Sequence, residues 1–181
     1  MEIYSVKTNG LNDPIGYDSK MLLCSWKVRD ARGAKQTWAK IRIGTDPELS
    51  DTVWEKEGNL NSLGEKLAFT PFPYTRYYYQ ITVRTDAGEE VESAVHFFET
   101  AKLSEPWQAK WIGVQGDDTH PEFFKSFNCR QAVHSARLYI CGLGLFEASI
   151  NGQKVGNDLL APFINDYEEH YQYCTYDVTK Q

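Results

Sequence analysis

A chain of 181 residues is long enough to form one large domain or two small ones with a hydrophobic core. Its 11 Tyr, 9 Phe and 5 Trp, together with 13 Gly and 7 Pro, favour β-sheet joined by turns over a helical bundle. The 19 Lys and Arg against 25 Asp and Glu give a net charge of −6, which argues against nucleic acid and anionic membranes as partners, because both bind basic faces.

The first hundred residues contain short strand-like runs at regular spacing, the pattern of a β-sandwich. The expected strands are 3–7, 21–28, 37–44, 53–54, 67–69, 76–84 and 94–99. The strongest is Arg76–Arg84, in which every second residue is Tyr, Ile or Val, and Asp86-Ala87-Gly88 predicts the turn after it. The same alternation in 21–28 and 37–44 predicts that Leu22, Cys24, Trp26, Ala39, Ile41 and Ile43 face the core.

Residues 101–105 read as a linker, and the spacing of aromatic residues changes beyond Pro106. Strands are expected at 123–128, 137–141 and 171–178. Between them, Phe146–Ile150 alternates apolar and polar residues and is followed by Asn151-Gly152. This dipeptide tolerates positive φ at both positions, so it predicts a type I′ hairpin that returns at Gln153–Val155.

The four cysteines, Cys24, Cys129, Cys141 and Cys174, are far apart and include no Cys-x-x-Cys pair. We therefore expect reduced thiols acting as small core residues rather than a zinc site, with one disulfide as the open alternative. Asp117, Asp118 and His120 lie in a polar loop and are expected to be solvated turn residues, not metal ligands.

Neither a catalytic pair nor a phosphate-binding loop is evident. Glu168, Glu169 and His170 are consecutive, and neighbouring residues of a strand point to opposite faces, so we expect a charged surface. Gly142–Glu147 lacks a third glycine and leads into a strand rather than a helix. The sequence therefore predicts no catalytic residue, no metal ligand and no cofactor in this chain, and leaves substrate-binding residues unknown.

Trp26, followed by P-Y-T-R-Y-Y-Y-Q-I-T-V-R-T-D-A-G, resembles a fibronectin type III domain. That family has a buried Trp in an early strand, a Thr-x-Tyr start to its sixth strand and a Gly in the next turn. The resemblance implies an immunoglobulin-like sandwich for the first half of the chain. It implies no function, because such domains serve as spacers, receptors and enzyme appendages alike.

Several further motifs occur in a fixed order. They are R-G-A-K-Q-T-W-A-K-I-R-I, F-F-E-T, W-Q-A-K-W-I-G, F-F-K-S-F, A-R-L-Y-I-C-G-L-G-L-F-E-A-S-I-N-G-Q-K-V-G, L-A-P-F-I-N-D-Y and Y-C-T-Y-D-V-T. Together they resemble the N-terminal region of bacterial α-L-rhamnosidases over nearly the whole chain. The resemblance implies modular glycoside hydrolases that remove terminal α-L-rhamnose with inversion, using two acids in a helical (α/α)₆ barrel.

No part of this sequence matches the barrel, so the resemblance carries over no catalytic residue and implies that this chain alone is inactive. Some relatives insert a calcium-dependent rhamnose-binding module after the Trp-x-x-x-Trp-Ile segment. Here only Gly113–Glu122 separates Ile112 from Phe123, so we expect that module to be absent.

On this basis we expect an all-β chain, with a fibronectin type III-like sandwich at 1–103 and a truncated jelly-roll-like sandwich at 104–181. The chain would support or pack on the barrel of its parent enzyme, and its truncated second domain would self-associate through an unpaired edge or apolar face. Trp38, Trp54, Tyr74 and Tyr78 are expected opposite the core, packing against another domain rather than stacking on sugar.

The competing interpretation is a stand-alone carbohydrate-binding or adhesion module. A receptor-like protein-binding module would rest on the fibronectin resemblance alone and leaves the second half unexplained. The N-terminus has no apolar run of the length that a secretion signal needs, so we expect a cytoplasmic protein.

Overall fold

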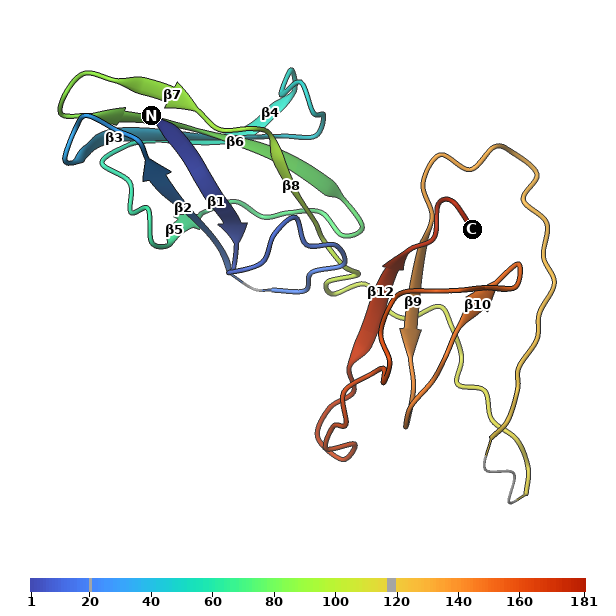
Figure 1. Cartoon of the computed structure of the whole chain (residues 1–181). Helices are drawn as coiled ribbons and strands as arrows, with labels where there is room; N and C mark the ends of the chain where they lie inside the picture. Colours follow the sequence, from blue (N-terminus) through green and yellow to red (C-terminus); the bar gives the residue numbers. More distant parts are fainter. Residues whose placement is uncertain (20, 117–119) are drawn as a thin grey trace. The chain divides into compact units, whose positions relative to one another are not determined.

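The computed structural model describes all residues except Lys20 and 117–119. It divides into two compact units, Met1–Leu103 and Ser104–Gln181 (Figure 1). Every regular element in the described residues is a β-strand, so the all-β prediction is confirmed. Across the same residues, no helix has the length and apolar character needed to cross a membrane.

The first unit is an immunoglobulin-like sandwich of two antiparallel sheets, which Figure 1 shows face to face. One sheet has the order β1-β2-β5, with strands Glu2–Thr8, Leu22–Arg29 and Glu65–Leu67. The other has the order β4-β3-β6-β7, with strands Thr52–Gly58, Gln36–Gly44, Arg76–Thr85 and Glu90–Glu92. Strand β8, His96–Glu99, also pairs with β6.

The core of this unit consists of the alternating residues that the sequence predicts. Trp26 and Cys24 of β2 lie between the sheets with Ile41 and Ile43 of β3, and Tyr77, Tyr79, Ile81 and Val83 of β6 complete the cluster. Burial of each large apolar side chain contributes about 1.5–3 kcal/mol. The two buried tyrosines keep their hydroxyls satisfied, because the Tyr77 hydroxyl accepts the Phe72 N–H at 2.8 Å and the Tyr79 hydroxyl accepts the Thr8 hydroxyl at 3.1 Å.

The closing strand differs from the prediction of one run at 94–99. Strand β7 was not predicted, and Ser93, Ala94 and Val95 separate it from β8. The Ser93 hydroxyl accepts the Ile81 N–H at 3.1 Å, and the Ser93 N–H donates to the Ile81 carbonyl at 2.8 Å. A side chain therefore replaces a main-chain partner at this point, which lets the edge strand break without leaving β6 unsatisfied.

The second unit contains four short strands in its described residues. Strand β9, Arg137–Cys141, pairs with β12, Tyr173–Asp177, and β10, Ser149–Ile150, pairs with β11, Gln153–Lys154 (Figure 1). Asn151 and Gly152 have φ values of 51° and 76°, which confirms the predicted type I′ turn. The predicted alternation of Phe146–Ile150 is also confirmed, since its apolar residues are half-buried and its polar residues exposed.

The strand predicted at 123–128 is wrong. This stretch has no regular structure, and the side chains of Phe123, Phe124 and Phe127 are exposed. A strand is stabilised only when a neighbouring strand takes its backbone hydrogen bonds, and no strand pairs with this stretch in the described part of the chain.

Two glycines of the second unit provide a matched test of its packing. Gly152 and Gly156 both have positive φ, so alanine at either position introduces left-handed strain of about 1–2 kcal/mol. Open space surrounds Gly152, whereas a Cβ on Gly156 would meet the ring of Tyr176. That ring is fixed because its hydroxyl donates to the Asp158 carboxylate at 2.8 Å.

We therefore predict that Gly156→Ala destabilises the β9–β12 sheet more than Gly152→Ala does. Hydrogen exchange of the β12 amides in increasing urea measures the two losses. Equal losses for both variants would show that Tyr176 does not constrain this turn.

Candidate functional site

The four aromatic residues proposed as a surface group do not form one platform. Trp38 lies on the outer face of β3 beneath the guanidinium of Arg84, 4.9 Å from the ring centroid. Tyr78 packs against Phe97 of β8, with 6.3 Å between the ring centroids. It lies six residues along β6 from Arg84, the residue opposite Trp38. Six residues of strand span about 20 Å. A guanidinium over the Trp38 ring also occupies the face that a sugar would stack on.

Trp54 and Tyr74 do not lie on the outer face of the sheet, where the sequence analysis placed them. Trp54 is opposite Ile43 in the β3–β4 pair, and its ring lies 6.2 Å from Phe69, on the core side of the sheet rather than opposite it. Tyr74 lies in the loop before β6 with its side chain exposed. The pair Trp38 and Tyr78 alone faces outward from the sheet as predicted.

The sequence analysis assumed that Glu168 and Glu169 lie on a strand, but the structure places them in a turn. Asp166 organises a turn in which its side chain accepts the Glu168 N–H and its carbonyl accepts the N–H groups of Glu169 and His170. Glu168, Glu169 and His170 are all exposed. The turn is stabilised by the Asx-type hydrogen bond from the Glu168 N–H to the Asp166 side chain. Asn165-Asp166 is a turn-favouring pair that the strand prediction did not take into account.

The metal hypothesis has little support in the described part of the chain. Asp117 and Asp118 lie outside the described residues, while His120 is exposed. Residues 1–19, 21–116 and 120–181 contain no group of three or more His, Cys, Asp or Glu side chains arranged to hold a metal ion.

All four cysteines are free thiols, but only one is a core residue. Burial, with a smaller contribution from the Glu65 carboxylate, raises the pKa of the Cys24 thiol to about 12, so it is protonated and inert at neutral pH. Cys141 and Cys174 are half-buried, and Cys129 is exposed, so the prediction of core residues is wrong for Cys129. Cys141 is opposite Tyr173 and Cys174 is opposite Ile140, so the two thiols point to opposite faces of the sheet.

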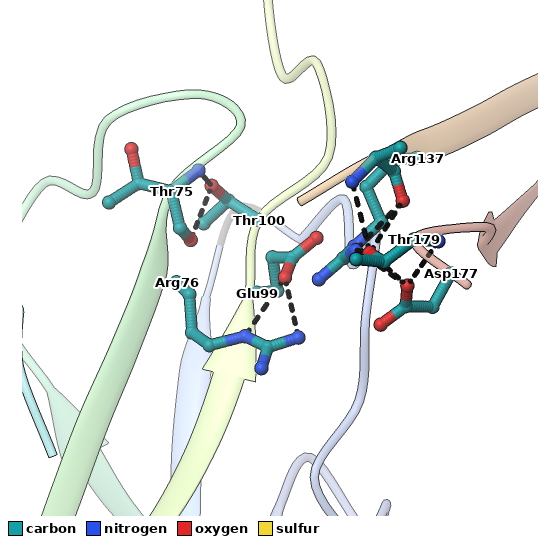
Figure 2. Close-up of polar contacts among 8 residues, drawn as sticks. Thr75, Arg76, Glu99, Thr100, Arg137, Asp177 and Thr179 are labelled. Atoms are coloured by element: carbon teal, nitrogen blue, oxygen red, sulfur yellow. Dashed lines mark hydrogen bonds and ion pairs between the residues drawn. The ribbon is translucent and has the colours of Figure 1, made fainter. Parts of the chain in front are cut away.

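The first unit buries two glutamates, Glu65 and Glu99, and the sequence analysis missed both. The Glu99 carboxylate is 5% exposed and accepts Nε and Nη2 of Arg76 at 3.0 and 2.9 Å (Figure 2). The Arg76 guanidinium also lies 4.2 Å from the Phe97 ring centroid. Beside them, the Thr100 hydroxyl accepts the Thr75 N–H at 2.9 Å and donates to the Phe72 carbonyl at 2.7 Å.

These contacts tie the loop before β6 to the end of β8. The signal that predicts them is register, because Arg76 and Glu99 are directly opposite once β6 and β8 pair. Every charged group of the pair is matched by its partner, so the arrangement suits a structural clamp rather than proton transfer.

A second clamp closes the β9–β12 pair of the other unit. Arg137, whose side chain is 12% exposed, donates to the Asp177 carboxylate at 2.9 Å and to the Thr179 hydroxyl at 3.2 Å (Figure 2). Thr179 in turn donates to Asp177 at 2.6 Å and accepts the Ala136 N–H at 3.0 Å. The motif Y-D-V-T therefore supplies the polar end of this sheet.

The second unit also exposes many large apolar side chains, Ile112, Leu143 and Leu145 among them, and two stretches of chain are rich in them. One carries Phe123, Phe124 and Phe127, and the other carries Leu159, Leu160, Phe163 and Ile164. Trp107 and Trp111 lie edge-on against Tyr173 and Tyr171, with ring centroids 5.3 and 5.9 Å apart. Among the described residues of this unit, the buried apolar residues are Val155, Ala161, Pro162 and Val178. Contiguous exposed apolar surface is a general feature of interaction sites.

Comparisons with known families match both units. Residues 3–104 match the family of Rha78A-like N-terminal immunoglobulin domains, and residues 131–181 match the α-L-rhamnosidase N-terminal domain. The chain therefore combines an immunoglobulin-like β-sandwich with a stretch that matches an α-L-rhamnosidase N-terminal domain.

Curated relatives agree along the whole chain. An α-L-rhamnosidase of Formosa agariphila is 26% identical over 216 residues, covering 100% of this chain and 23% of that protein. An α-L-rhamnosidase of Alteromonas sp. is 24% identical and covers 94% of this chain and 21% of that protein. This chain thus spans less than a quarter of the length of these relatives.

Solved structures share the fold. The α-L-rhamnosidase from Dictyoglumus thermophilum superposes with a TM-score of 0.83 at 28% identity, over 99% of this chain and 23% of that one. The enzyme from Aspergillus terreus superposes with a TM-score of 0.77 at 21% identity, over 99% of this chain and 22% of that one. The chain belongs to the Rha78A-like N-terminal immunoglobulin family and corresponds to the N-terminal region of α-L-rhamnosidases.

The clamp of the first unit predicts unequal costs for two glutamates on the same sheet. Glu99→Gln leaves the half-buried Arg76 guanidinium without its carboxylate and should cost about 2 kcal/mol. Glu90→Gln removes the exposed pair with Arg84 and should cost under about 1 kcal/mol. Urea unfolding followed by hydrogen exchange of the β6 amides measures both, and a Glu90 loss as large as that of Glu99 would contradict the clamp.

Proposed function

We propose that this chain is the non-catalytic N-terminal part of a glycoside hydrolase that removes terminal α-L-rhamnose. One observation carries the proposal: the chain aligns along its full length with proteins named α-L-rhamnosidase while spanning 23% of the first of them. The structural match to the enzyme from Dictyoglumus thermophilum over 99% of this chain supports the same assignment.

The part played by this region in the parent enzyme is support and packing. The parent would carry its acid and base in an (α/α)₆ barrel outside residues 1–181, with the two carboxyl groups roughly 6.5–9.5 Å apart, as inversion requires. Two features favour a packing role. The buried carboxylate Glu99 and the clamp residue Asp177 are held by arginines, and the second unit exposes apolar side chains in two stretches.

We predict that residues 1–181 do not hydrolyse an aryl α-L-rhamnoside, whereas the complete polypeptide does. Release of the aryl group measures the activity, and proton NMR of the first-formed sugar distinguishes inversion from retention. Hydrolysis by the isolated chain, or retained configuration with the complete protein, would contradict the proposal. Binding of L-rhamnose to the isolated chain in calorimetry would support a carbohydrate-binding module instead.

The exposed phenylalanines lead us to propose that the isolated chain self-associates. Phe124 is 92% exposed, and Phe123 and Phe127 lie beside it in sequence, so contact between copies removes apolar surface from water. We predict that the weight-average mass in sedimentation equilibrium rises with concentration above the 20.8 kDa monomer, and that Phe124→Ser with Phe127→Ser lowers it. A concentration-independent monomer would contradict this prediction.

A further inference from the structure

The stretch 157–165, here named the apolar loop, presents its large side chains outward from a buried anchor. Leu159, Leu160, Phe163 and Ile164 are 91, 70, 79 and 86% exposed, whereas Ala161 between them is 6% exposed. The Ala161 carbonyl accepts the Phe146 N–H at 2.8 Å, which fixes the middle of the loop to the start of the hairpin.

The first end of the apolar loop is fixed as well. The Asp158 carboxylate accepts the Tyr176 hydroxyl from β12 at 2.8 Å. Just beyond the other end, the Asp166 carbonyl accepts the His170 N–H at 3.0 Å within a local turn. Exposed apolar residues on an anchored loop are preorganised for a contact, because little conformational entropy remains to be lost when they are covered.

Along the sequence, the charged residues nearest the apolar loop are all acidic. Asp158, Asp166, Glu168 and Glu169 flank the four apolar residues, and no Lys or Arg occurs between Lys154 and Lys180. A symmetric contact between two copies would bring these carboxylates together, and like charges at an interface oppose association. The rim therefore favours a partner that carries basic side chains around an apolar surface.

We propose that the apolar loop docks onto an apolar surface rimmed by Lys and Arg in the remainder of the same polypeptide. The proposal rests on the proposed function, and the length of the relatives supports it. More than three quarters of the Formosa agariphila enzyme lies outside the region that this chain matches, so a large covering surface is available within one polypeptide.

The test uses the parent polypeptide from residue 182 onward, expressed separately and titrated with residues 1–181 in a calorimeter. Phe163→Ser with Ile164→Ser should weaken binding about tenfold or more, because two side chains leave the interface. Glu168→Lys with Glu169→Lys should weaken it as well, and wild-type binding should weaken as NaCl rises from about 0.05 M to about 0.5 M. The matched control is Leu63→Ser, which removes an 85% exposed apolar side chain of the first unit and should leave binding unchanged.

Each contrary outcome overturns a defined part of the account. Loop variants that bind as tightly as the wild type, binding that does not respond to salt, or a reading frame that stops at Gln181 would overturn the docking proposal. Loss of self-association by the loop variant would make a second copy the occupant. If the two parts bind through the loop but the assembled protein does not cleave rhamnosides, the proposed function fails while the docking proposal stands.

Discussion

Burial of apolar side chains between paired strands is the constraint on which this molecule depends. In the first unit, β3 and β6 meet over eight residue pairs and place Ile41 opposite Ile81 at the centre of the sandwich. Polar groups enter this core only where they are paired, as the hydroxyls of Tyr77 and Tyr79 are. The outer strands carry charges that discourage further pairing, Glu55 and Glu57 on β4 and Glu90 and Glu92 on β7.

The second unit meets the same constraint less completely. Its polar organisation is well developed, with the Arg137 clamp, the type I′ turn and the Asp166 turn in place. Its apolar residues are not similarly enclosed, since few of those described are buried, whereas Phe124 and Leu159 are over nine-tenths exposed. A surface of this kind gains free energy when a further surface covers it. This contrast is the physical reason for proposing that the second unit contacts the rest of a larger enzyme.

Prediction from sequence succeeded where a strand has a regular partner and a half-buried pattern. The alternation in β2, β3 and β6 identified the core residues, and Asn151-Gly152 identified the turn from two residues alone. It failed where a strand needs a partner that the local sequence does not specify. The three phenylalanines of 123–128 favour a strand, but no partner strand is present in the described residues. Periodicity also placed Trp54 on the wrong side, because the register between β3 and β4 decides which face it occupies.

The clamps were beyond prediction for a related reason. Arg76 and Glu99 are 23 residues apart, and Arg137 and Asp177 come from strands joined by a long connection. Opposite charges at such separations carry no local signal until the register of the strands is known. The family resemblance, in contrast, followed from several motifs that occur in one order. No single motif among them is specific enough to show the family.

The most direct test of the central claim is hydrogen–deuterium exchange on residues 1–181, measured in isolation and within the complete polypeptide. If the second unit is covered by the rest of the enzyme, amides of β9, β12 and the apolar loop should exchange more slowly in the complete protein. Amides of the first-unit core strands β3 and β6 should exchange at similar rates in both. Equal exchange of the second unit in the two samples would contradict the account.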